Sequence, residues 1–219
     1  SDILSRFEAG RMPEGPEEIE GKAVTLQLRQ QNFIQRPEDV YAVRWCGGGG
    51  FGDPLERDPM LVARDFEQLS VTARTALDVY GVVINAETGE ADLPATEALR
   101  DRTRAERVAR SDVPCTRKVG KRVLLAMEHL AVMRNGGESF LACPKCNAYL
   151  GGVADNYKDF CIREERPVSA ANPLIGDPAR FIDDPVVFRQ FFCPGCGRLL
   201  ENEVALKDDP LLHDVRLEI

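Results

Sequence analysis

The sequence contains no apolar run approaching the roughly 20 residues that a membrane-spanning helix needs. Residues 1–6 lack the charged-then-apolar pattern of a secretory signal peptide. An excess of positive charge is also missing, because the formal net charge is -8 and the pI is about 5.0. Nucleic-acid binders usually carry a basic face that displaces the counterions of phosphate groups. We therefore expect a cytoplasmic protein whose partners include neither a membrane nor a nucleic acid.

Histidine is also scarce, and the sequence contains only His129 and His213. Neither has an acidic neighbour at catalytic spacing, so we interpret both as surface or packing residues. The chain has 219 residues, 43% of them hydrophobic, which is enough for a packed core. In a reducing compartment, its seven cysteines are better explained as metal ligands and buried thiols than as disulfides.

Four of these cysteines form two matching knuckles, Cys143-Pro144-Lys145-Cys146 and Cys193-Pro194-Gly195-Cys196. Two CxxC turns that face each other supply the four thiolates of a tetrahedral metal site. A redox pair needs only one CxxC at the start of a helix, whereas both knuckles here follow strand-like segments. We predict a closed, structural zinc site, with iron as the alternative occupant of the same ligands. Cys46, Cys115 and Cys161 are interpreted as buried or idle thiols.

The pattern along the chain predicts an α+β protein with three regions. Residues 1–21 are a peripheral arm rich in Gly, Pro and Glu, residues 22–112 a small β and helical region, and residues 113–219 a zinc-ribbon domain. Strands are expected at residues 23–28 and 40–45, and a short one at 82–84. Helices are expected from Asp58-Pro59 to residue 66, from a Ser70 cap to Gly81, and, exposed to solvent, over residues 97–110.

The second half repeats the order strand, knuckle, strand, which is typical of a zinc ribbon. A strand through Val123, Leu125 and Met127 precedes a turn at residues 135–137, although a helix is the alternative there. The knuckles are separated by 46 residues, which is long for a compact ribbon. We interpret residues 151–188 as an ordered insert that wraps a neighbouring chain.

A glycine run at residues 47–52 formally matches the dinucleotide fingerprint G-x-G-x-x-G. That fingerprint requires a helix to open at its third glycine, but Asp53-Pro54 intervenes before the helix expected at Pro59. No Lys-Ser or Lys-Thr follows, so the run is not a P-loop. We expect these glycines to let the backbone pass close to another chain.

Two stretches carry a family resemblance. The sequence GGGGFGDPLERDP at residues 47–59, continuing through Leu61-Val62-Ala63-Arg64-Asp65 and Val79-Tyr80-Gly81-Val82-Val83, resembles the C-terminal tail of the hydantoinase B/5-oxoprolinase family over residues 37–84. Asp155-Asn156-Tyr157-Lys158-Asp159 and Phe191-Phe192-Cys193-Pro194-Gly195-Cys196-Gly197 resemble the small zinc-containing subunit of acetone and acetophenone carboxylases. Those enzymes belong to the same superfamily.

The resemblance implies ATP-dependent carboxylation of a ketone by large hydantoinase A-like and B-like subunits. The catalytic body of a B-like subunit is missing from this sequence, so no catalytic or cofactor-binding residue is transferred to it. We expect this chain to be a zinc-binding accessory subunit of a hetero-oligomer. In that assembly the partner subunits bind ATP, with or without a divalent metal ion. Alternatives are a subunit of an ATP-dependent hydantoinase or lactamase, a free nucleic-acid-binding zinc ribbon, and a rubredoxin-like electron carrier.

Overall fold

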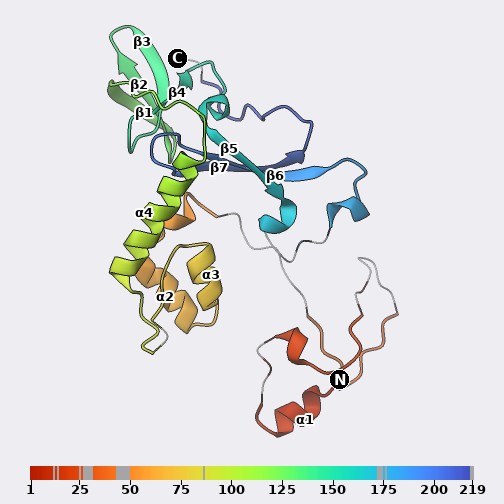
Figure 1. Ribbon diagram of the computed structural model, residues 1–219. Coiled ribbons are helices and arrows are strands. Elements are labelled where there is room, and N and C mark those ends of the chain that lie inside the picture. Colours follow the sequence, from red (N-terminus) through yellow and green to blue (C-terminus); the bar gives the residue numbers. More distant parts are fainter. Residues whose placement is uncertain are drawn as a thin grey trace. The chain divides into compact units, whose positions relative to one another are not determined.

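The computed structural model describes residues 1–11, 13, 15–24, 26, 32–42, 50–85, 87–171, 175 and 177–217 (Figure 1). Contacts divide the chain into two units, Ser1–Gly49 and Gly50–Ile219, which are described separately. Cys46 and residues 47–49 of the glycine run lie outside the described residues. No helix in the described part of the chain is long and apolar enough to cross a membrane.

The first unit contains one short α-helix, α1 (Ile3–Glu8), and a 3-10 turn, η1 (Pro16–Glu18). The Ser1 hydroxyl donates a 2.6 Å hydrogen bond to the Glu38 carbonyl and so ties the start of the unit to its later part. Strands were predicted at residues 23–28 and 40–45, and residues 25, 27–28 and 43–45 lie outside the described part. The described residues of these two segments do not form strands, because no described segment pairs with them.

The second unit opens with three short helical elements, η2 (Pro54–Glu56), α2 (Pro59–Glu67) and α3 (Ala73–Asp78). The predicted start of α2 is confirmed, since the Asp58 carboxylate accepts a 2.9 Å hydrogen bond from the Met60 amide. The predicted Ser70 cap of α3 is wrong. Thr72 caps this helix instead, by accepting a hydrogen bond from the Thr75 amide.

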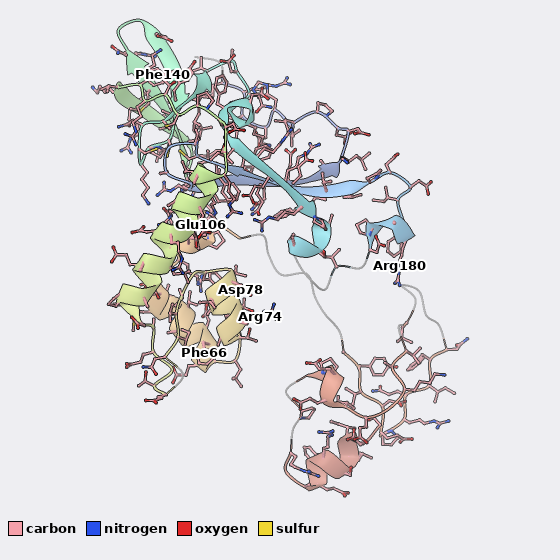
Figure 2. All side chains as sticks on the ribbon, viewed as in Figure 1. Phe66, Arg74, Asp78, Glu106, Phe140 and Arg180 are labelled. Atoms are coloured by element: carbon pink, nitrogen blue, oxygen red, sulfur yellow. The ribbon has the colours of Figure 1, made fainter. Side chains whose placement is uncertain are left out.

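Helix α3 also ends earlier than predicted, at Asp78 instead of Gly81. An ion pair between Arg74 and Asp78 lies on its exposed side (Figure 2). The short strand predicted at residues 82–84 is reduced to a single β-bridge between Ile84 and Ala91. Val82 is nevertheless fully buried, because it completes a small core with α2 and α3.

Helix α4 (Leu93–Ala109) begins four residues earlier than predicted, because the Asp92 carboxylate accepts from the Ala95 amide and Pro94 occupies its first turn. The prediction that this helix is exposed is wrong for one face. Arg100 on that face is buried and donates to the carbonyl oxygens of Tyr80 and Arg57 at 3.0 and 2.8 Å. The helix therefore packs on the α2 and α3 layer (Figure 1).

The remainder of the second unit forms two antiparallel sheets. The first has the order β1-β2-β3-β4 and the second the order β5-β6-β7. Their bounds are β1 Lys121–Met127, β2 Leu130–Asn135, β3 Glu138–Ala142, β4 Tyr149–Gly152, β5 Ile162–Pro167, β6 Val186–Phe192 and β7 Leu199–Leu206. The predicted strand at β1, the turn between β2 and β3, and the repeated order strand, knuckle, strand are confirmed.

The long insert between the knuckles supplies strand β5 and the 3-10 turns η3 (Tyr157–Phe160), η4 (Val168–Ala170) and η5 (Pro178–Arg180). Sequence analysis missed β5 because its residues are mostly charged and do not alternate with apolar ones. It becomes a strand by pairing with β6, from Ile162 opposite Phe192 to Pro167 opposite Val187.

The main core lies where the two sheets meet. Both sheets and the turn η3 contribute to it, with Leu130, Val132, Leu141, Leu150, Tyr157, Phe191 and Leu200 buried together around the cysteine knuckles. Both sheets thus contribute side chains to one buried cluster, which also contains Cys143 and Cys193 of the knuckles.

Buried charges fasten the C-terminal segment over this core. The Arg189 guanidinium, only 2% exposed, donates to the carbonyl oxygens of Leu206, Lys207 and Asp209 and pairs with Glu203 at 2.9 Å. Lys158 pairs with Glu203 at 2.9 Å and with Asp214 at 3.1 Å. Burial raises the pKa of Glu203, but the hydrogen bonds from Lys158 and Arg189 outweigh it and hold that pKa below its ordinary value.

The Arg189 network predicts a large difference between two Arg→Met substitutions. Arg189→Met leaves buried carboxylates and carbonyls without their donor and is expected to lower the free energy of unfolding by about 3 kcal/mol. Arg163→Met is the control, because the Arg163 side chain is 49% exposed and lies 3.8 Å from Glu165. It is expected to change stability by less than about 0.5 kcal/mol. Urea unfolding followed by circular dichroism measures both, and equal losses would contradict the anchoring role.

Candidate metal centre

The two knuckles have the same backbone geometry. In the first, the Cys143 amide donates to the Ala148 carbonyl, and the Asn147 amide donates back to Cys143. In the second, the Cys193 amide donates to Arg198, and the Gly197 amide donates back to Cys193. Asn147 and Gly197 occupy equivalent positions, both with positive φ, at 59° and 66°. Each turn thereby directs its two thiols to one side.

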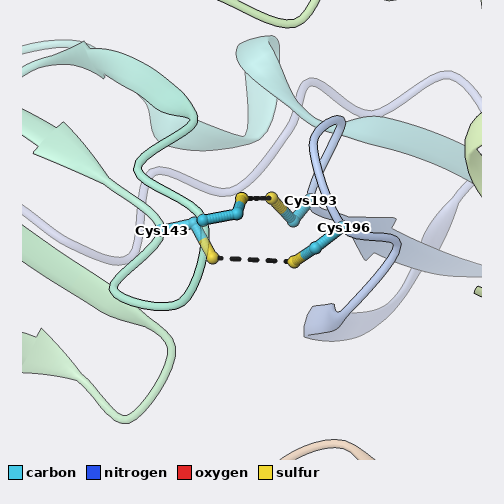
Figure 3. Close-up of side chains that lie close together, drawn as sticks. Cys143, Cys193 and Cys196 are labelled. Carbon is cyan, nitrogen blue, oxygen red and sulfur yellow. Dashed lines mark hydrogen bonds between the residues drawn. The ribbon is translucent and has the colours of Figure 1, made fainter. Parts of the chain in front are cut away.

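The four thiols predicted as ligands come together. The Sγ atoms of Cys143, Cys146, Cys193 and Cys196 all lie within 4.8 Å of one another. Two of the distances between the knuckles are 3.8 Å, from Cys143 to Cys196, and 3.5 Å, from Cys146 to Cys193 (Figure 3). A tetrahedral zinc ion with Zn–S bonds of about 2.3 Å separates its sulfur ligands by about 3.8 Å. The residues present therefore fit a tetrahedral ion of this size.

The four neighbouring thiols differ in how readily each loses its proton. Hydrogen bonds from the thiols of Cys146, Cys193 and Cys196 hold the pKa of Cys143 below its ordinary value. Hydrogen bonds to Cys143, Cys146 and Cys196 raise the pKa of Cys193, and burial and the charge of a nearby Cys143 thiolate raise it further, so the four thiols do not ionise together. A divalent cation removes this conflict, since it stabilises all four thiolates at once. Four sulfur ligands leave no open coordination position, so such a site can hold structure but cannot activate water.

The remaining described cysteines lie outside this cluster. Cys161 is buried and its thiol donates to the Tyr157 carbonyl at 3.2 Å, and burial raises its pKa. Cys115 is exposed, with its Sγ beside Gly195 in the second knuckle. His213 is half-buried in the C-terminal segment.

Sequence analysis missed a polar junction next to the second knuckle. The Asp53 side chain is completely buried there and accepts 3.0 Å hydrogen bonds from the amides of Leu55 and Leu199. His129 is also buried, with Nε2 accepting from the Asp53 amide at 3.2 Å and Nδ1 facing Arg198 at 3.2 Å. Asp53 is thus hydrogen-bonded to β7 and to the residue just before β2, although both lie far from it in the sequence.

Glu56 connects this junction to both knuckles. Its carboxylate receives a 2.8 Å hydrogen bond from Arg198, just after the second knuckle, and lies 3.5 Å from Lys145 in the first. Burial raises the pKa of Glu56, but Arg198 and Lys145 outweigh it and hold that pKa below its ordinary value. The turn η2 therefore spans the two loops that carry the thiols.

Helix α4 contacts the second knuckle through Arg107 and the turn η2 through Arg104. The Arg107 guanidinium donates to the Gly197 carbonyl at 3.0 Å and stacks 4.4 Å from the centre of the Phe192 ring. Arg104 donates to the Leu55 carbonyl at 3.0 Å. Arg100, Arg104 and Arg107 are spaced four and three residues apart, which places them on one helix face. That spacing is visible in the sequence and could have identified the buried face.

The close approach of α4 to Gly197 gives a test with a matched control. Gly136→Ala requires a positive φ of 60° but meets no atom within 4 Å, so it is expected to cost about 1 kcal/mol. Gly197→Ala has the similar φ of 66°, and its new methyl group would lie 2.4 Å from the Arg104 carbonyl oxygen. We expect it to cost about 3 kcal/mol.

Urea unfolding measures both variants, and hydrogen exchange reports on α4. Faster exchange of the α4 amides is expected only in Gly197→Ala. Equal losses of stability in the two variants would show that the helix does not dock on the knuckle.

Parts of the chain are similar in sequence to subunits of known carboxylases. Residues 118–219, which hold all four clustered cysteines, match the family model of the acetone carboxylase gamma subunit. The acetophenone carboxylase beta subunit of Aromatoleum aromaticum is 32% identical over 80 residues, covering 35% of this chain and 62% of that subunit.

Two longer relatives are also similar over part of the chain. The acetone carboxylase alpha subunit of Xanthobacter autotrophicus is 42% identical over 76 residues, covering 33% of this chain and 10% of the relative. The acetophenone carboxylase delta subunit of A. aromaticum is 44% identical over 83 residues, covering 37% of this chain and 12% of the relative. The chain thus spans about a tenth of these two relatives and less than two thirds of the beta subunit. Over residues 118–219 it is similar to the gamma subunit of acetone carboxylase.

Proposed function

We propose that this chain is a non-catalytic, metal-binding accessory subunit of an ATP-dependent ketone carboxylase of the acetone or acetophenone type. The observation that carries the proposal is the gamma-subunit match over residues 118–219, the region that contains the four-cysteine cluster. The relatives, all named as carboxylase subunits, support it further. The partners are large hydantoinase A-like and B-like subunits, which hold the ATP, and the complex acts in the cytoplasm.

In this proposal Cys143, Cys146, Cys193 and Cys196 hold a structural zinc ion. The support is the closeness of their sulfur atoms, which all lie within 4.8 Å of one another, and the preference of structural zinc for four thiolate ligands. The metal joins β3 and β4 to β6 and β7, since each knuckle connects two of these strands. Its work is to keep the two sheets in one arrangement, so that the chain can clamp the assembly.

The front of the chain has a different part in the same proposal. Residues 22–112 supply a hydantoinase B-like C-terminal segment to a large partner, residues 1–21 form a peripheral arm, and residues 113–219 form the zinc-ribbon domain. The resemblance of residues 37–84 to the hydantoinase B tail supports this role. So does the modest size of the core beside α2 and α3, which in the described part of the chain has three fully buried residues, Val62, Ala76 and Val82.

The proposal predicts that loss of the metal loosens the complex. Cys193→Ser removes a buried ligand and is expected to lower bound zinc from about one ion per chain to below about 0.2. The fraction of the complex that loses its large subunits should match the fraction of zinc that is lost. Metal analysis and native mass spectrometry of the purified complex measure both quantities. Cys115→Ser is the control, because Cys115 lies beside the second knuckle but outside the ligand set.

Three results would contradict the proposal. If Cys193→Ser loses the metal while the complex and its activity stay intact, the metal does not clamp the assembly. A red protein with the absorption spectrum of an iron tetrathiolate would show that the four cysteines hold a rubredoxin-like iron centre and not zinc. If the complex hydrolyses a lactam or hydantoin with ATP and does not carboxylate a ketone, the chain serves the other branch of the superfamily.

A further inference from the structure

Strand β1 forms one edge of the four-stranded sheet and has no strand on its outer side among the described residues. The opposite edge, β4, is covered by the chain itself. There the Tyr149 amide donates to the Thr116 carbonyl at 2.7 Å, and Arg117 forms a β-bridge with Ala148. The two edges of one sheet are therefore treated differently, and only β1 is left open.

The composition of β1 is that of an interior strand. Five consecutive apolar residues, 123–127, follow its basic start. Such runs are typical of strands that are covered on both faces. Nevertheless Val123, Leu124 and Leu125 are 44%, 39% and 51% exposed, whereas Val132 on the neighbouring β2 is fully buried. A long apolar edge exposed in this way invites another strand.

The charges at the start of β1 indicate what kind of strand fits. Lys121 lies directly opposite Arg134 on β2, and like charges in this position repel each other. Lys121 and Arg134 are both exposed. In the described part of the chain, neither of them nor Arg122 forms an ion pair with a carboxylate. This basic corner stands out in a chain with a net charge of -8. A carboxylate placed beside Lys121 would relieve the repulsion.

The register of β1 disfavours a second copy of this chain as the partner. Its pairing with β2 is interrupted by β-bulges between Arg122 and Leu124 and between Leu125 and Met127. Bulges increase the local twist of an edge, which hinders the pairing of two long edges with each other. Two copies of β1 would have to match two bulged edges, whereas an extended segment can follow the twist of one.

We propose that β1 is the docking edge for an extended segment of a large carboxylase subunit, which adds a strand beside it. This segment places apolar side chains against residues 123–125 and a carboxylate beside Lys121 and Arg134. Main-chain hydrogen bonds provide the pairing, and the side chains provide the specificity. The inference rests on the proposed function, because it identifies where the accessory subunit holds its partner.

The test compares variants within the complex formed by co-expression with the large subunits. Val123→Lys and Lys121→Glu should each raise the dissociation constant of the complex at least tenfold, as measured by mass photometry at fixed salt concentration. Val204→Lys is the control, since Val204 is also an exposed strand valine, at 60%, but lies on β7. Circular dichroism and zinc content should be unchanged in all three. Hydrogen exchange should show that the outward-facing β1 amides are protected only in the complex.

The outcomes separate the two proposals. If the unchanged chain does not associate with the large carboxylase subunits, the proposed function fails. If it does, but Val123→Lys binds as well as Val204→Lys, only the docking edge is refuted. A free chain that is a dimer and becomes monomeric in Val123→Lys would show that a second copy occupies β1. Equal protection of the outward-facing amides in the free chain would show that this chain covers its own edge.

Discussion

The meeting of the two cysteine knuckles is the constraint on which the second unit depends. Each knuckle connects two strands, so bringing four sulfur atoms within 4.8 Å of one another also brings the ends of β3, β4, β6 and β7 together. The main core forms around this point, with residues of both sheets buried beside Cys143 and Cys193. A bound cation favours this arrangement because it stabilises thiolates that would otherwise repel one another.

The same junction also organises the helices. Asp53 accepts from the Leu199 amide after the second knuckle, Glu56 pairs with Lys145 in the first, and Arg107 on α4 donates to the Gly197 carbonyl at the second. A fully buried carboxylate such as that of Asp53 is stable only because it accepts hydrogen bonds from two amides and lies near a guanidinium group. The helical layer and the two knuckles are therefore connected by polar contacts.

These contacts agree with the proposed role of an accessory subunit that holds other chains in place. A tetrathiolate site offers no open position for chemistry, but a metal bound there would tie the loop between β3 and β4 to the loop between β6 and β7. The C-terminal segment, fastened by Arg189 and Lys158, closes the far side of the same core. The apolar edge at β1 is exposed, whereas the start of β4 is paired with the chain at Thr116. An exposed apolar edge is well suited to bind an extended segment of another chain.

The amino-acid sequence alone indicated the four cysteines that cluster, the repeated strand and knuckle order, and the Asp58 start of α2, because each of these signals is a short local pattern. It also carried the resemblance to small carboxylase subunits. It did not reveal β5, whose charged residues form a strand only when β6 pairs with them. Nor did it reveal the junction of Asp53, His129 and Arg198, or the exposed edge of β1. Those features were decided by the tertiary structure, since burial and pairing between distant segments depend on how the whole chain packs.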